Sequence, residues 1–336
     1  MNLKRMNPKR TTIRSLTCGL AATALTALAL PAGAADDFPT RPIKLVVGYS
    51  VGGPTDVLAR LFAKDMTEIL GQTVLVENKP GAAGRIGTEF VARSTPDGYT
   101  LTVSTLAHNV NPILFPSAVK YDPLKDFAPV ILTSLLPMVV INAYEAPAKS
   151  VTDIIGKAKA DPGGVTYGSS GVGGSAHLAA ALLEARSATK MNHVPFQGNG
   201  PALQELMAGR LDFMFYPMVG VKPQVEAKRI KPIGVTTPQR HPDYPDTPTM
   251  SELGFKGFEE YTQGIGILAP TGTPPAIVGK LNAALNKGLK RPETVERLNQ
   301  LGAIVAGGTP QEFATWLGED EKRWREVVKA ANVPVQ

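Results

Sequence analysis

Cysteine is almost absent from this 336-residue chain. The only one, Cys18, lies near the N-terminus, so no pair of cysteines is available for a disulfide bond or a zinc site. Only four histidines occur, and no H-E-x-x-H pattern is present. We therefore expect no metal and no cofactor, and the fold must be stabilised by its apolar core.

Nucleotide-binding and hydrolase motifs are missing as well. A dinucleotide site needs G-x-G-x-x-G, whereas residues 168–174 read G-x-x-G-x-G-G. The G-K-[ST] of a P-loop is absent, and the glycines of Gly168-Ser169-Ser170-Gly171 are three residues apart, not four as in a nucleophile elbow. Nothing here predicts an enzyme, although a triad that assembles only in space stays open.

The first 34 residues have the composition of a secretory signal peptide. Five basic residues precede an apolar run from Leu16 to Leu30, which is short for a membrane span, and small residues follow at Ala32-Gly33-Ala34. A signal anchor is the alternative, but the polar Asp36-Asp37 favours cleavage after Ala34. We expect export to the periplasm without a lipid anchor, because Cys18 precedes most of the apolar run.

A basic excess is absent once this segment is removed. The whole chain has 35 Lys and Arg against 29 Asp and Glu, but five of the basic residues and none of the acids lie in residues 1–34. The rest of the chain has a net charge of +1 and no basic run with interleaved aromatics. We therefore expect no nucleic-acid partner.

What the chain does have is a repeated alternation of strand and helix patterns, typical of an α/β fold. The first half predicts strands at 43–47, 74–76 and 99–104, with helices at 56–70 and from 84 to 93. The second half repeats this plan, with strands at 165–167, 192–194 and 211–216 and helices at 176–185 and 201–209. The tail predicts helices near 276–289, 292–300 and 310–331.

The two halves predict two lobes that face each other across one cleft. In open α/β sheets the loops that follow the strands lie at the carboxyl edge, where ligands bind. The apolar stretches Leu132–Ile141 and Tyr261–Leu268 are the candidate crossings between the lobes.

The loop Gly48-Tyr49-Ser50-Val51-Gly52-Gly53 leads from the first strand into a helix. The first amides of a helix are unpaired and attract an anion without Lys or Arg. Thr55 or Asp56 could cap the helix, and we expect Asp56 to cap or to order water, because its charge would repel an anion.

The loop 168–175 is richer, with three serines and four glycines before a helix. Its hydroxyls add donors to the amides, although a flexible loop with Ser175 as a cap is the alternative. Gln197, Asn199 and His177 are weaker candidates. The loop 107–111 also follows a strand, and its His108 could lie at the surface.

Several motifs, in order along nearly the whole exported chain, resemble the solute receptors of tripartite tricarboxylate transporters, the Bug or TctC family. They are Arg41-Pro42-Ile43, Gly52-Gly53-Pro54-Thr55-Asp56, Val76-Glu77-Asn78-Lys79-Pro80-Gly81-Ala82-Ala83-Gly84, Pro96-Asp97-Gly98-Tyr99-Thr100, Tyr167-Gly168-Ser169-Ser170-Gly171, His193-Val194-Pro195-Phe196, Gly200-Pro201-Ala202 and Ala269-Pro270-Thr271-Gly272-Thr273-Pro274.

This resemblance implies a type II periplasmic binding protein, with two doubly wound lobes, two crossing strands and a cleft that closes on a small organic acid. It predicts a signal peptide at 1–34, a first lobe at 35–136 and 263–336, and a second lobe at 137–262. Its implied ligand-binding residues are Tyr49, Ser50, Gly52, Gly53, Asp56, His108, Asn109, Ser169, Ser170, Gly173, Ser175, His177, Gln197, Gly198 and Asn199.

One position departs from the family pattern. Many relatives have Lys or Arg where Gln197 stands, so a Gln197 side chain that reaches the cleft would favour a less charged acid. We expect a monomeric periplasmic receptor that binds a mono- or dicarboxylate, or an aromatic or amino acid, and delivers it to a membrane permease. The alternatives are an exported enzyme that acts on a carboxylate, or a receptor that docks to a sensor protein.

Overall fold

The computed structural model describes residues 37–258 and 261–336, of which 39–336 pack as one unit. The signal peptide predicted at 1–34 lies outside the described residues. Among the described residues, no helix has the length and apolar character needed to cross a membrane.

A six-stranded sheet forms the first half of this unit, in the order β11-β4-β10-β3-β1-β2. β1 is parallel to β2 and β3, whereas β10 is antiparallel to β3 and β4. Four of the five residues of β1 are buried, as expected for a strand that is covered on both faces. The bounds are β1 Ile43–Val47, β2 Val74–Asn78, β3 Thr100–Ser104, β4 Phe127–Leu136, β10 Gln263–Pro270 and β11 Ile304–Val305.

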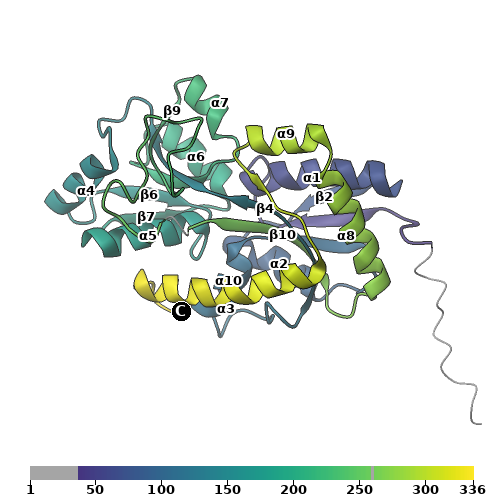
Figure 1. Cartoon of the computed structure of the whole chain (residues 1–336). Helices are drawn as coiled ribbons and strands as arrows, with labels where there is room; N and C mark the ends of the chain where they lie inside the picture. The colour runs from purple at the N-terminus through teal and green to yellow at the C-terminus, as the bar shows by residue number, and fades with distance from the viewer. Residues whose placement is uncertain (1–36, 259–260) are drawn as a thin grey trace, which may run out of the picture. The chain divides into compact units, whose positions relative to one another are not determined.

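Six α-helices and a short 3-10 helix accompany this sheet (Figure 1). α1 packs beside α8, and α10 packs along α3 and β4 and also reaches α5 of the second half. α1 ends where Gly71 adopts a left-handed conformation, with φ 68°. The bounds are α1 Pro54–Leu70, η2 Ala82–Gly84, α2 Arg85–Ala92, α3 Leu106–Leu114, α8 Pro275–Leu289, α9 Pro292–Gln300 and α10 Pro310–Ala330.

The second half repeats the strand order of the first. β8-β5-β9 and β6-β7 are joined by a bridge between Tyr167 and Phe213, which gives β7-β6-β8-β5-β9. This order matches β2-β1-β3-β10-β4, with β5 in the place of the antiparallel β10. The predicted two-lobe α/β fold is confirmed. The bounds are β5 Met138–Ala143, β6 Thr166–Ser169, β7 Asn192–Pro195, β8 Met214–Pro217 and β9 Ile230–Val235.

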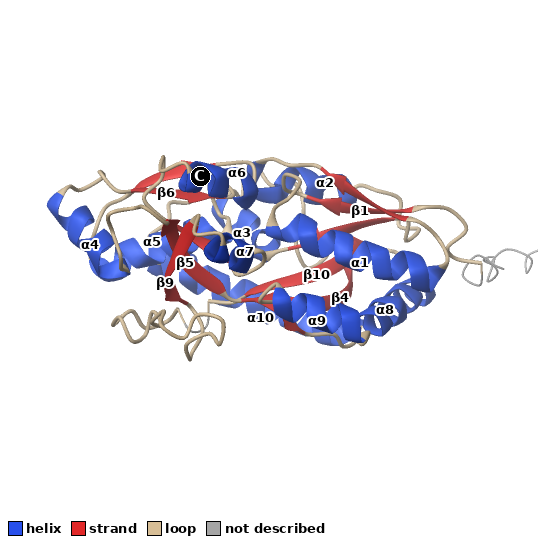
Figure 2. Ribbon diagram, turned by 90° about the horizontal axis from the view of Figure 1, so that it is seen from above, coloured by secondary structure: helices blue, strands red, loops and turns tan. Residues whose placement is uncertain are grey.

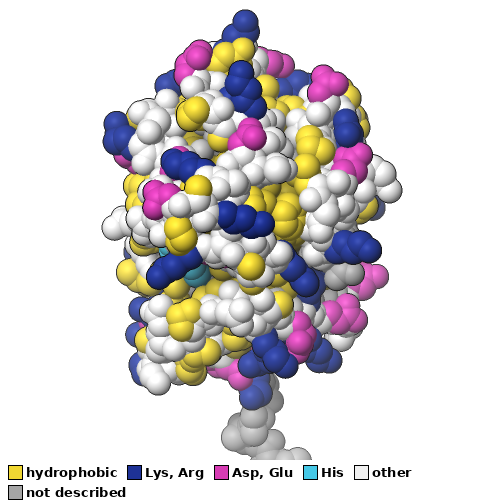
Figure 3. Space-filling view, turned by 90° about the vertical axis from the view of Figure 1, so that its left-hand side faces the viewer, with side chains coloured by type: hydrophobic (Ala, Val, Ile, Leu, Met, Phe, Trp, Pro, Cys, Tyr) yellow, Lys and Arg dark blue, Asp and Glu magenta, His cyan; other side chains and the backbone are white. Residues whose placement is uncertain are grey.

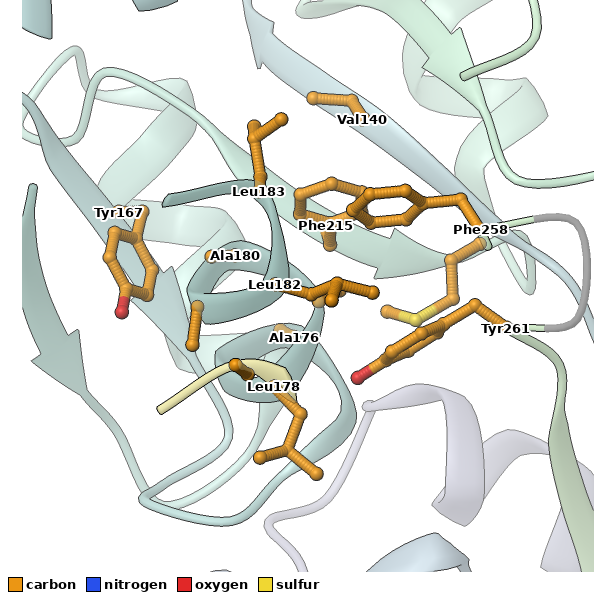
Figure 4. Close-up of a cluster of buried hydrophobic side chains, with 14 of the residues drawn as sticks. Val140, Tyr167, Ala176, Leu178, Ala180, Leu182, Leu183, Phe215, Phe258 and Tyr261 are labelled. Atoms are coloured by element: carbon orange, nitrogen blue, oxygen red, sulfur yellow. The ribbon is translucent and has the colours of Figure 1, made fainter. Parts of the chain in front are cut away.

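The core of the second half surrounds α5, which is buried from Ser175 to Leu183. Small and aliphatic side chains cover all sides of this helix, as expected for one enclosed by protein. Figure 4 shows α5 packed against Phe215, Phe258 and Tyr261. The other helices of this half are α4 Val151–Ala160, α6 Asn199–Met207 and α7 Val221–Glu226, and α5 spans Ser175–Ser187.

The chain passes between the two sheets at the end of β4. β4 ends at Leu136 and β5 begins at Met138, inside the predicted crossing Leu132–Ile141. The return runs into β10, which overlaps the predicted crossing Tyr261–Leu268. Figure 2 shows β4 and β10 beside α1 and α8, with β5 and β9 beyond their ends. The lobe boundaries themselves stay a prediction.

Charges of both signs are mixed over the end of the unit that carries α4 and α5. Figure 3 shows Lys and Arg interspersed with Asp and Glu and with apolar side chains on this face. Such a surface gives no extended field of one sign for a polyanion.

Two Gly→Ala variants test the packing of α10 on β10. An ideal Cβ at Gly266 would lie 2.1 Å from Cζ of the buried Phe313, so we expect G266A to lower the free energy of unfolding by about 1–3 kcal/mol. Gly279 is exposed on α8 and has no atom within 4 Å of its Cβ position, so G279A should raise it by about 0.5–1 kcal/mol. Urea denaturation measures both, and equal effects would contradict this packing.

Candidate functional site

Loops from both halves enclose a small cavity. Its volume is about 10 Å³, which is room for about one water molecule. Five of its lining residues belong to the predicted site: Tyr49, Gly53, Ser170, Ser175 and Asn199. The others are Pro54, Thr55, Thr105 and Gln263.

Four helices begin at this cavity. α1 begins after Gly53, α3 after Thr105, α5 at Ser175 and α6 at Asn199. The first amides of a helix have no partner within the helix and carry a partial positive charge. None of the lining side chains is charged. The cavity is therefore suited to an anion that is held by amides and hydroxyls.

Several polar side chains in the cavity have no protein partner. Within the described residues, no hydrogen bond is made by the side chains of Thr55, Ser170, Ser175 and Gln263, which are 7%, 4%, 3% and 4% exposed. The Oδ1 atom of Asn199 is also buried and unpaired. Buried polar groups nearly always have a partner, so these side chains indicate a site for a polar molecule.

The loop from β1 to α1 touches the loop from β7 to α6. Ser50 donates from its amide (3.1 Å) and from its hydroxyl (2.7 Å) to the carbonyl of Gln197. Gly198 has φ 141°, and a Cβ there would lie 3.3 Å from the Ser50 amide nitrogen. Glycine is thus needed both for the conformation and for the close approach. Gln197 itself is exposed and does not line the cavity, so its side chain gives no support to the expected preference for a less charged acid.

Asp56 organises the first of these loops rather than the cavity. Its carboxylate accepts hydrogen bonds from the Gly52 amide, from Nε and Nη2 of Arg60 and from Nδ2 of Asn78. Burial would raise the pKa of Asp56, but these hydrogen bonds outweigh it and the pKa is lowered. The expectation that Thr55 or Asp56 caps α1 is wrong, because the cap is Gly53 and no side chain bonds to the helix start.

Tyr49 connects the same loop to α3. Its hydroxyl lies 2.9 Å from Oγ1 of Thr105 and donates to the Ala83 carbonyl at 3.2 Å. Burial raises the pKa of Tyr49 to about 12, against the opposing effect of the Thr105 hydrogen bond. The phenol is therefore neutral and adds no negative charge to the cavity.

The loop from β6 to α5 is held from behind by two histidines. Oγ of Ser169 lies 2.5 Å from Nε2 of His193, and the Gly173 amide donates to Nδ1 of His177 at 3.1 Å. Ser169, Gly173 and His177 do not line the cavity, and neither do Ser50, Gly52, Asp56 and Gly198. Ser175 is not the cap of α5, since Gly174 occupies that position without a side-chain bond.

His108 and Asn109 require a correction. The expected loop 107–111 belongs to helix α3, and both side chains are buried away from the cavity. Nε2 of His108 lies 2.8 Å from the Pro123 carbonyl, and burial lowers the pKa of His108 to about 4. Asn109 donates to the Leu317 carbonyl and to Asp320, both on α10.

A family model agrees with this architecture. Residues 58–333 match the tripartite tricarboxylate transporter family receptor. The chain belongs to this receptor family. The resemblance inferred from the sequence motifs is therefore confirmed.

Characterised receptors share both sequence and fold with this one. The protein BugT of Bordetella pertussis is 33% identical over 297 residues, which is 88% of this chain and 90% of BugT. The structure of MatC from Rhodopseudomonas palustris with bound malate is 34% identical, with a TM-score of 0.82, 87% of this chain covered and 100% of MatC. Another R. palustris protein, with adipate, is 34% identical, with a TM-score of 0.84 and coverages of 88% and 99%.

Sequence reasoning missed Thr105 and Gln263 as cavity residues of this receptor. Thr105 directly follows β3, so its place at the carboxyl edge of the sheet was a usable signal. Gln263 is the first residue of the antiparallel strand β10 and meets the cavity only through the long-range pairing of β10 with β4. No local pattern marks it.

The role of Asp56 predicts a large effect of D56N. The amide keeps the shape but turns one acceptor oxygen into a donor that faces Arg60 or Asn78. Arg60 is half exposed, so the loss comes mainly from unpaired hydrogen bonds, and we expect the free energy of unfolding at pH 7 to fall by about 1–3 kcal/mol. The exposed Lys64 in the same helix gives the control K64Q, which should change it by less than about 0.5 kcal/mol.

This difference should depend on pH. Because the pKa of Asp56 is lowered in the folded chain, its contribution is present above the ordinary value of 3.8 and is lost as the pH falls through the folded value. The gap between wild type and D56N should therefore be constant near neutral pH and shrink in acid. A gap that grew in acid would contradict the assigned hydrogen bonds.

Proposed function

We propose that this chain is a periplasmic receptor that captures a small organic acid and delivers it to the membrane permease of a tripartite tricarboxylate transporter. The observation that carries the proposal is the meeting of four helix N-termini at one cavity that is lined by neutral polar groups. Malate and adipate in the structures of two relatives belong to the same chemical class.

A carboxylate satisfies both needs of this cavity. Its oxygens accept hydrogen bonds from the first amides of α1, α5 and α6 and from the hydroxyls of Thr55, Ser170 and Ser175. Each hydrogen bond to a charged group contributes about 1.5–3 kcal/mol. The amides of Asn199 and Gln263 both donate and accept, so they suit a second polar group on the acid.

Binding requires the two lobes to move. A volume of about 10 Å³ is far smaller than a four-carbon acid, so the cavity must widen for entry. We propose that the lobes 35–136 with 263–336 and 137–262 rotate about the two crossings, a known form of domain closure. The hydrogen bonds from Ser50 to Gln197 then form when the cleft closes.

Binding without turnover fits the contacts of the serines. Ser169, which lies against His193, is fully buried and outside the cavity. Ser170 faces the cavity, but within the described residues its hydroxyl has no histidine partner. A catalytic serine needs a base within hydrogen-bond reach, so we propose a receptor and not an enzyme.

Thermal shift of the ligand-stripped chain from Ala35 tests the proposal against organic acids, sugars, nucleotides and amino acids. Binding to the native state alone adds about 2.7 kcal/mol of stability at a hundredfold excess over Kd. We expect shifts with a few related carboxylates, including malate or adipate. Shifts confined to sugars or nucleotides would overturn the assignment, and product formation from a carboxylate would favour the enzyme.

A charge reversal of the cavity sharpens this test. Q263E places a carboxylate in the cavity, where repulsion at short range should weaken acid binding at pH 8 by about 100-fold or more. Q311E, at an exposed position of α10 away from the cavity, is the matched control and should bind as wild type does. Equal affinity of the two variants would show that the acid binds elsewhere.

A further inference from the structure

Three aromatic rings are stacked directly behind the loop from β6 to α5. The ring centroids of His177 and His193 lie 4.2 Å apart, and those of His193 and Tyr167 lie 5.1 Å apart. His177 lies in the first turn of α5, His193 in β7 and Tyr167 in β6. The stack therefore joins three elements of the second lobe at the point where Ser170 and Ser175 enter the cavity.

Both imidazoles are bonded to this loop, but they respond differently to a proton. Nδ1 of His177 accepts from the Gly173 amide, so it needs its lone pair. Nε2 of His193 meets a hydroxyl, that of Ser169, which can either donate or accept. Protonation would thus preserve the contact of His193 and replace that of His177 with two opposed N–H groups.

Gly173 is a sensitive point for such a change. It has φ 82°, and a Cβ there would lie 3.1 Å from the side chain of Leu114. The loop is short, and Ser170 and Ser175 lie three and two residues from Gly173. Loss of the bond to His177 would therefore disturb cavity residues directly.

The surroundings disfavour charge on His177 yet let a proton reach it. His177 and Tyr167 line a separate cavity of about 440 Å³, together with Glu184 of α5 and the uncharged chain end 331–334. Glu184 accepts from the Tyr167 hydroxyl and from the Met191 amide, and Lys190 acts on it. Burial lowers the pKa of His177 to about 4, and burial together with His177 lowers the pKa of His193 to about 3.

We propose that His177 is a positioning residue that makes acid binding depend on pH: its neutral ring holds Gly173 and the cavity loop in the binding conformation, and its protonation releases them. This inference rests on the proposed receptor function. The sign follows from the geometry, since the closed loop disfavours the proton and an open loop accepts it. Affinity should be full above the ordinary histidine range and fall in acid.

The test compares H177N with wild type and with a matched control. The Oδ1 atom of asparagine can replace Nδ1 as the acceptor for the Gly173 amide but does not titrate. His241 also accepts a backbone amide at Nδ1, from Asp243, in a segment away from the cavity, so H241N is the control. Calorimetry gives the Kd of malate and adipate for each protein at pH 7.5 and 5.0.

Wild type and H241N should lose about 10- to 30-fold in affinity on acidification relative to the loss of H177N, if an open loop returns His177 to an ordinary pKa. Ionisation of the acid affects all three proteins equally and cancels. H177N should bind at pH 7.5 nearly as wild type does, whereas H177L, which has no acceptor, should bind weakly at both pH values. Equal pH dependence in wild type and H177N would overturn the inference.

A second readout does not depend on a bound acid. Amide hydrogen exchange across residues 169–175 at pH 5.0 should be faster in wild type and H241N than in H177N, and equal in all three at pH 7.5. If neither acid binds at pH 7.5, the receptor proposal fails for these acids, and the exchange result alone decides the role of His177. Equal exchange at pH 5.0 contradicts that role.

Discussion

The unpaired amides at the starts of helices are the constraint on which this structure depends. A buried N–H group without an acceptor is costly, and four helices begin at the same cavity. The shared strand order of the two sheets produces this arrangement, because the loops after β1, β3, β6 and β7 all leave the carboxyl edges of parallel strands. Anion binding thus follows from the topology and needs no Lys or Arg.

A second layer of contacts fixes the loops that carry these amides. Asp56 holds the loop after β1 through the Gly52 amide, and His177 holds the loop after β6 through the Gly173 amide. Neither side chain lines the cavity. Their effect on binding therefore acts through backbone position, which separates them from Ser170 and Ser175 in the cavity itself.

The sequence predicted the fold well and the site in part, for distinct physical reasons. Apolar runs and glycine loops are local signals, so the strands and the repeat were predictable, and Ser170, Ser175 and Asn199 were found because they follow strands directly. Side-chain direction is not local. His108 and Asn109 also follow a strand, but α3 begins at Leu106 and turns their side chains toward Pro123 and α10. Gln263 enters the cavity through a long-range strand pairing that no nearby motif reveals.

A crystal structure of the chain with bound malate or adipate tests the central claim most directly. The account predicts carboxylate oxygens within hydrogen-bond distance of the first amides of α1 and α5, with the hydroxyls of Ser170 and Ser175 or the amide of Gln263 completing the contacts. An acid bound instead in the surface groove beside Arg41 and Arg93, or in the cavity behind His177, would contradict it.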